Sequence, residues 1–129
     1  MRSVFILVFL LCSSSALLSQ ELNVELNEGE KWKANQETTD GIKAMQDKVS
    51  AFENNQTQSG MELHLALLND FQMIFAKCTM KGNAHEQLHN YLIPLRSLLV
   101  PLQDCSKENC EDELPAVKSH LSAYHDYFE

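Results

Sequence analysis

The chain has 129 residues, a length that fits one domain rather than two. Its 18 acidic and 10 basic residues give a formal net charge of −8. This balance argues against a general nucleic-acid binder and against electrostatic docking on anionic lipid, because both need concentrated basic charge. With 44% hydrophobic residues, 4 glycines and 3 prolines, the composition also excludes collagen-like and low-complexity chains.

Residues 1–20 are predicted to be an export signal that is removed near Ser19 or Gln20. Arg2 provides the positive start, and an unbroken apolar run follows at residues 4–12. This run is shorter than the roughly 20 apolar residues that a membrane-spanning helix needs. Two alternatives are a retained anchor and a lipid attached at Cys12, although Leu11 fits the second poorly.

No later segment is long and apolar enough to span a membrane. We therefore expect a periplasmic or secreted protein whose single domain covers residues 21–129.

Apolar side chains at spacings of three and four predict the first two helices of this domain. A polar segment at residues 21–34, with Trp32 as its large side chain, leads to Asn35, a favourable helix N-cap. The second helix is expected at about residues 61–78, and Gly82 is expected to terminate it. The predicted core rows are Thr38, Ile42, Met45, Val49 and Phe52 in the first helix, and His64, Leu67, Phe71, Ile74 and Cys78 in the second, widened by Leu68 and Phe75.

Two further helices are predicted in the C-terminal half. The third begins at Asn83, with Glu86 as a capping-box partner, and Pro94 is expected to kink it. The fourth begins near Asp112, with Pro115 in its first turn. The predicted core rows are His85, Leu88, Leu92, Leu95, Leu99 and Leu102, then Leu114, Val117, Leu121, Tyr124 and Phe128. Four such helices with short connections predict an all-α fold, an antiparallel up-down-up-down four-helix bundle.

Three cysteines, an odd number, remain after removal of the signal. Cys105 and Cys110 lie close together in a polar turn and are expected to form a disulfide. Cys78 lies at the other end of the third helix, about 30 Å away, whereas a disulfide needs Cα atoms within about 7 Å. Cys78 is therefore expected to be unpaired and to be buried, used as a ligand, or joined to a partner.

A candidate metal site comprises Cys78, Met80, His85 and His89. The two histidines are four residues apart and therefore share a helix face. Thiolate, thioether and imidazole donors suit copper(I), and the Cys and His donors also suit zinc(II). In the predicted topology Trp32, Tyr124 and His125 lie at the same end of the bundle.

A purely structural interpretation is also open for these residues. A buried Cys behaves as a small hydrophobe, and a His pair at this spacing often occurs by chance. His64 is interpreted as structural because it lies about 21 Å from Cys78 along its helix, and His120 as a boundary residue. Non-covalent haem is a further alternative, since Met and His are axial ligands, but the covalent motif C-x-x-C-H is absent.

The segment His85–His89 also matches the zinc-protease letters H-E-x-x-H, in which Glu86 would be the general base. The chain offers no clear third ligand and no partner domain for such a site. With no other catalytic motif in the sequence, we expect no enzymatic activity.

Residues 26–35 read L-N-x-G-x-K-W-x-x-N, and residues 78–89 read C-T-M-K-G-x-x-H-x-x-L-H. Leu92 and Pro94 continue the second pattern. These two patterns resemble a family of small exported helical proteins of Gram-negative bacteria. The resemblance implies a periplasmic helical bundle, in which the glycosylation sequon at Asn55 is not used.

The sequence therefore predicts a periplasmic helical bundle that binds a soft transition metal, above all copper, for buffering or sensing. The alternative is a non-enzymatic interaction module of the cell envelope that recognises a protein partner without metal. A secreted, cytokine-like ligand is a third alternative and requires a eukaryotic source.

Overall fold

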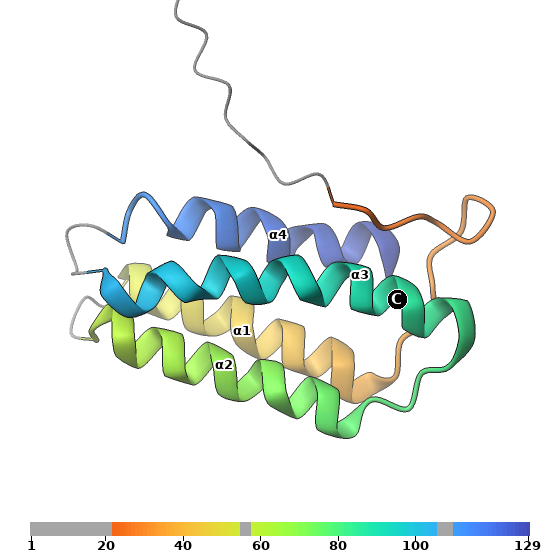
Figure 1. Cartoon of the computed structure of the whole chain (residues 1–129), viewed down its shortest axis with the longest axis horizontal. Helices are drawn as coiled ribbons and strands as arrows, with labels where there is room; N and C mark the ends of the chain where they lie inside the picture. Colours follow the sequence, from red (N-terminus) through yellow and green to blue (C-terminus); the bar gives the residue numbers. More distant parts are fainter. Residues whose placement is uncertain (1–21, 55–57, 106–109) are drawn as a thin grey trace, which may run out of the picture.

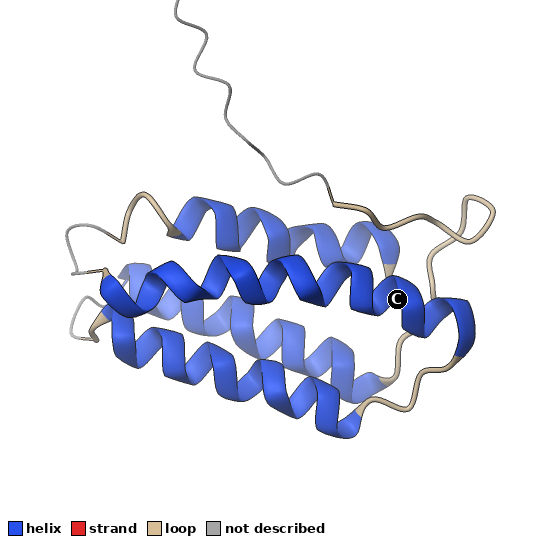
Figure 2. Cartoon of the chain, in the orientation of Figure 1, coloured by secondary structure: helices blue, strands red, loops and turns tan. Residues whose placement is uncertain are grey.

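The computed structural model describes residues 22–54, 58–105 and 110–129. The predicted export signal, Cys12 and the sequon at Asn55 lie outside these ranges. The described residues form four α-helices and one 3-10 helix: α1 (Gln36–Asn54), α2 (Gly60–Lys77), α3 (Gly82–Leu99), η1 (Val100–Asp104) and α4 (Leu114–Tyr127). The prediction of an all-α fold with four main helices is confirmed over these residues, where Figure 2 shows only helices and loops.

The four helices lie side by side with roughly aligned axes (Figure 1). α1 packs against α2 and α4, and α3 packs against the same two helices. The core between them takes one row of side chains from each helix. Its fully enclosed members include Ile42 and Met45 of α1, Leu63 and Leu67 of α2, Leu88, Tyr91 and Leu95 of α3, and Val117 and Tyr124 of α4.

Local sequence signals explain where α2 and α4 begin. Ser59 and Glu62 form a capping box in which the Ser59 Oγ accepts from the Glu62 amide at 3.2 Å and Glu62 accepts from the Ser59 amide at 2.7 Å. Pro115 lies in the first turn of α4, as predicted, where its missing N–H costs no helical hydrogen bond.

The ends of α2, α3 and α4 differ in detail from the prediction. Gly82 does not terminate α2, which ends at Lys77; it begins α3, with a positive φ of 65° that glycine adopts easily. The expected capping box at Asn83 and Glu86 does not form, because the N-cap position belongs to Lys81, which makes no side-chain cap. Asp112 lies in a turn before α4.

Two predictions about the core face of α2 are also wrong. Leu63, not His64, is the buried residue at the start of the helix, and the half-buried His64 hydrogen-bonds the Leu99 carbonyl at 2.7 Å. Phe75 does not widen the core row, since 43% of it is exposed. The helix therefore carries a second apolar row that faces outward.

The segment before α1 is tied to the C-terminus of the chain. Trp32 and Phe128 form a parallel bridge, with the Trp32 amide donating to the Tyr127 carbonyl at 2.8 Å and the Glu129 amide donating to the Trp32 carbonyl at 2.9 Å. Before this bridge, Gly29 has a φ of 90° in a tight turn. This segment (orange in Figure 1) runs past the end of the bundle at which α3 begins.

No helix within the described ranges combines the length and the apolar character needed to cross a bilayer.

Candidate metal centre

The connection between α2 and α3 brings a thiol and an imidazole together. Cys78 is the C-cap residue of α2, and His85 lies in the first turn of α3. The Cys78 Sγ and the His85 Nδ1 are 3.6 Å apart, and both side chains are half-buried. Among the cysteines of the described part, Cys78 is the one without a disulfide partner. The predicted proximity of Cys78 and His85 is therefore present in the fold.

Asn35 anchors this connection to the start of α1. Its Nδ2 donates to the Lys77 carbonyl at 3.2 Å, and its Oδ1 accepts from the Thr79 amide at 3.5 Å and from the Thr38 hydroxyl at 2.8 Å. These bonds hold the chain on both sides of Cys78. The thiol is thus presented on a supported turn rather than on a free loop.

His89 lies beside His85, one turn further along α3. The two imidazole rings have centroids 4.4 Å apart and planes inclined by 55°. The Phe75 ring meets His89 edge-on, with centroids 5.6 Å apart. His89 is therefore positioned by a ring on each side.

Tyr124 of α4 is a buried residue whose pKa responds to the charge of Cys78. Burial raises the pKa of its phenol, the hydrogen bond with Thr39 opposes this rise, and the charge of Cys78 adds to it. The Tyr124 Oη and Thr39 Oγ1 are 2.9 Å apart. Sequence patterns give no signal for Thr39 in this role, because its contact with Tyr124 spans two helices that are distant in the chain.

The contacts recorded for Met80 and Trp32 are with other parts of the fold. Met80 belongs to the same connection and is half-buried against the hydrophobic core. Trp32 donates its indole N–H to the Glu25 carbonyl at 2.6 Å, within the segment before α1.

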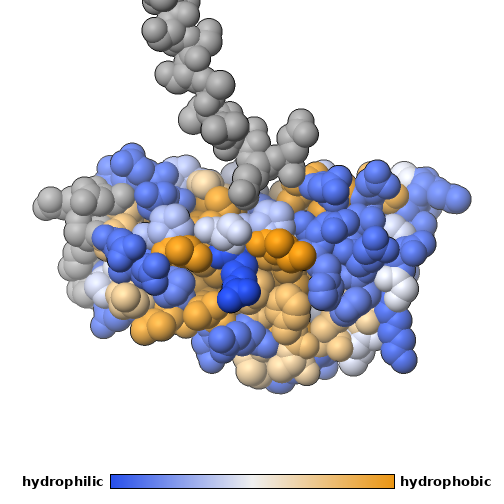
Figure 3. All heavy atoms as spheres, in the orientation of Figure 1, coloured by the Kyte–Doolittle hydropathy of each residue, from blue (hydrophilic) through white to orange (hydrophobic). Residues whose placement is uncertain are grey.

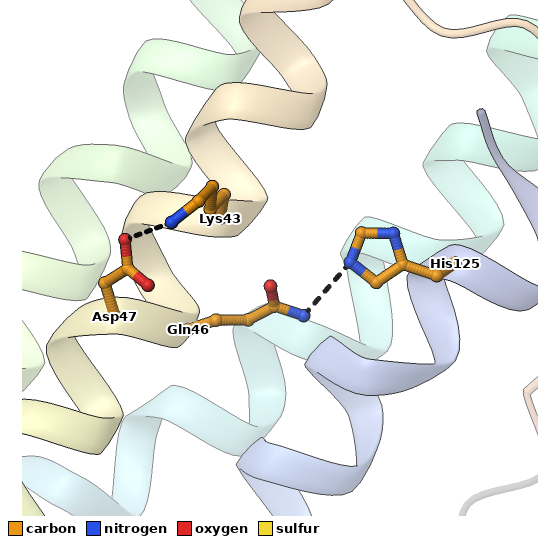
Figure 4. A network of polar contacts seen from close by, with 4 residues as sticks. All are labelled: Lys43, Gln46, Asp47 and His125. Carbon is orange, nitrogen blue, oxygen red and sulfur yellow. Dashed lines mark hydrogen bonds and ion pairs between the residues drawn. The ribbon is translucent and has the colours of Figure 1, made fainter.

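His125 faces α1 rather than Cys78. Figure 4 shows it beside Gln46, with the two Nε2 atoms 3.4 Å apart. Gln46 also donates to the Leu121 carbonyl at 3.0 Å, and Lys43 pairs with Asp47 at 2.7 Å one turn away. The two Gln46 contacts link α1 to α4, whereas the Lys43–Asp47 pair lies within α1.

The two histidines interpreted as structural have backbone partners. His64 is bonded to the Leu99 carbonyl, and His120 Nε2 donates to the Tyr91 carbonyl at 2.8 Å. Burial lowers the pKa of His120, and the hydrogen bond to Tyr91 partly opposes this shift.

The spacing of the Cys78–His85 pair matches that of two ligands on one metal ion. Zn–S bonds of about 2.3 Å and Zn–N bonds of about 2.0–2.1 Å at tetrahedral angles place S and N about 3.5–3.6 Å apart. Within the described ranges no group of three or more His, Cys, Asp or Glu side chains is arranged to hold a metal. The geometry thus offers two preformed donors, not a closed four-ligand site.

The Cys105 and Cys110 sulfurs are within bonding distance, with Cα atoms 5.1 Å apart, as the sequence predicts for a disulfide. They lie next to η1 and the start of α4, and these elements are at the opposite end of the bundle from the α2–α3 connection, to which Cys78 belongs (Figure 1). This separation explains why Cys78 is left over.

No protein-family model matches the chain, and neither a curated protein nor a solved structure shows significant similarity to it.

Proposed function

We propose that this protein is exported to the periplasm, folds as an antiparallel up-down-up-down bundle, and binds copper(I) for buffering or sensing. The Cys78 thiolate and the His85 imidazole are the two principal ligands. The observation that carries this proposal is the 3.6 Å separation of Cys78 Sγ and His85 Nδ1, which fits two ligands that meet one ion at a bent angle, with a third donor completing the copper(I) site.

Copper(I) is favoured over zinc(II) by the small number of preformed donors. A structural zinc site uses four ligands, whereas a thiolate with few neighbours suits soft copper(I) with its low coordination number. The Met80 thioether would be a weaker additional ligand from the same connection. His89, packed against the His85 ring, would fix the orientation of that imidazole or join as a further ligand.

The competing interpretation is a thiol–imidazole hydrogen bond with no metal, in which Cys78 and His85 only close the junction of α2 and α3. The two interpretations differ in solution. In the metal interpretation the pair takes up copper(I), and in the other the loss of either residue changes only stability.

The test is a copper(I) titration of the protein lacking residues 1–20, in competition with a coloured copper(I) chelator. Copper is kept reduced with ascorbate rather than with a thiol, because a thiol would open the Cys105–Cys110 disulfide and add competing ligands. We expect one equivalent to bind. Cys78→Ser and His85→Ala should each lose at least about tenfold in affinity, equivalent to about 1.4 kcal/mol.

The matched control is His125→Ala, which removes an exposed imidazole on the α1 side and should leave the affinity unchanged. X-ray absorption at the copper edge should show sulfur scattering that disappears in Cys78→Ser. Failure of the folded wild type to take copper(I) from the chelator, or unchanged binding by Cys78→Ser, would refute the proposal.

A further inference from the structure

The outward face of α2 carries a second apolar row that the core does not use. It consists of Met61, Leu65, Leu68 and Phe75, whose spacings of four, three and seven keep them on one face. Leu65 is 56% exposed and Met61 is 44% exposed. At 1.5 Å per residue the row is about 21 Å long.

A groove of about 660 Å³ lies between this row and α3. Its apolar walls are Leu68, Phe71 and Phe75 from α2, Ile93 from α3 and Val100 from the start of η1. Ile93 is 62% exposed, more than any other large hydrophobic side chain of the described residues. Figure 3 shows this apolar surface over α2 and α3, with polar residues around it. A contiguous apolar patch with a polar rim is typical of an interaction site.

One cation lies in this groove, and no carboxylate of the described residues forms an ion pair with it. Arg96 is the only charged residue among those that line it. The ion pairs of the described part involve Lys33, Lys43, Lys48 and Lys118, and none involves Arg96. In a chain of net charge −8, an unpaired guanidinium surrounded by apolar walls favours an occupant that brings its own carboxylate.

We propose that this groove binds an amphipathic helix of a partner protein, whose apolar stripe lies between α2 and α3 and whose Asp or Glu pairs with Arg96. Two roughly aligned helices leave a groove between their rows of side chains, and a third helix can pack into such a groove. A row of about 21 Å matches a partner helix of about four turns.

The charge pattern also argues against a second copy of this chain as the occupant. A symmetric pair would apply the same face twice, and the groove lining contains Arg96 but no acidic residue. Self-association would therefore bring two guanidinium groups into one patch without a carboxylate. The groove proposal uses none of the proposed metal ligands and is independent of copper binding.

The probe is a synthetic amphipathic peptide of about 16 residues, with leucines at helical spacing and one glutamate in the apolar stripe. Three versions place the glutamate at three successive turns, and matched versions carry lysine instead. By fluorescence anisotropy we expect at least one glutamate peptide to bind, at least about tenfold more tightly than its lysine counterpart. In Arg96→Glu this preference should reverse, and amide chemical shifts should change along α2 and α3.

Ile93→Asn should weaken binding, whereas Met73→Asn should not. Met73 is a matched control because it is 42% exposed on α2 but borders a different surface, with α1. Circular dichroism and thermal unfolding verify that each variant folds. Cys78→Ser should retain peptide binding, which separates this result from the copper experiment.

Four results would overturn the proposal. The first is that none of the three glutamate peptides binds. The second is that the preference for glutamate over lysine is the same in Arg96→Glu as in the wild type. The third is that the protein alone forms a dimer that Ile93→Asn dissociates, so that the occupant is a second copy. The fourth is that laurate displaces the bound peptide and itself requires Arg96, so that the ligand is a fatty acid.

Discussion

At the scale of single residues, Gly60 occupies the most crowded position of the four glycines. A Cβ placed there would lie 2.5 Å from both the carbonyl oxygen and the sulfur of Cys105, and 2.6 Å from the Leu102 carbonyl oxygen. Two of these three atoms belong to the backbone, and the third belongs to a disulfide. Gly60 thus lets the start of α2 pack directly against η1 and the Cys105–Cys110 bridge.

We expect Gly60→Ala to lower the free energy of unfolding by about 1–3 kcal/mol, the usual cost of overpacking. Gly41→Ala is the matched comparison and should lose less. A Cβ at Gly41 meets only the Ile74 side chain, at 2.5 Å to Cγ1 and 3.0 Å to Cδ1, and alanine there gains up to about 1 kcal/mol in helix propensity. Urea unfolding without thiol measures both; an equal loss, or a more stable Gly60→Ala, would contradict the argument.

Core rows are predictable from sequence where the residue type is unambiguous, and less so where it is amphipathic. Every predicted core position of α1 is buried. Tyr91 is also fully buried, although the pattern omits it, because its hydroxyl finds the His120 carbonyl at 2.9 Å. Phe75 is exposed although phenylalanine is usually buried. It lines a groove between helices, and the arrangement of those helices cannot be read from the sequence of α2 alone.

At the scale of elements, α3 and α4 are joined by a reciprocal pair of hydrogen bonds. The Tyr91 hydroxyl donates to the His120 carbonyl at 2.9 Å, and His120 Nε2 donates to the Tyr91 carbonyl at 2.8 Å. The two rings also pack, with centroids 4.6 Å apart. Burial of this pair lowers the pKa of His120 and raises that of Tyr91, so that both groups are neutral near pH 7.

The lowered pKa of His120 predicts that the folded state loses stability in acid. The unfolded chain binds a proton at the ordinary His pKa of about 6.5, and the folded chain only at a lower pH. The stabilisation is therefore complete above about pH 6.5 and declines as the pH falls toward the folded-state pKa. Urea unfolding at pH 7.5 to 5 should show a smaller pH dependence for His120→Gln, whereas the exposed His125→Gln should behave as wild type. Identical slopes for wild type and His120→Gln would exclude this role.

The candidate site shows which of its features follow from element order alone. Cys78 and His85 are seven residues apart across a short connection, so their proximity follows from the ends of two consecutive helices. The tilted packing of His89 against His85 does not follow, because it depends on side-chain rotamers and on Phe75 from the neighbouring helix. The same applies to His125, whose direction is set by Gln46 of α1.

At the scale of the whole molecule, the two ends of the described chain close one end of the bundle together. Phe128 is fully buried, stacks on Tyr124 with ring centroids 5.0 Å apart, and meets Tyr91 edge-on at 6.0 Å. Its backbone lies beside Trp32, and the Ala34 amide donates to the Glu129 carbonyl at 2.8 Å. The last residues therefore connect the aromatic core to the segment that precedes α1.

Phe128→Ala should thus affect both stability and the position of the N-terminal segment. Truncating a buried Phe costs about 3–5 kcal/mol, a large part of the 5–15 kcal/mol that stabilises a domain of this kind. Because Trp32 is the only tryptophan, its fluorescence should shift toward that of an exposed indole in the variant while circular dichroism still reports helices. Phe75→Ala removes a half-exposed ring and should cost less without moving the Trp32 signal. If Phe128→Ala lowers stability but leaves the Trp32 emission unchanged, the segment before α1 is held by its own contacts, and the C-terminal residues do not keep it in place.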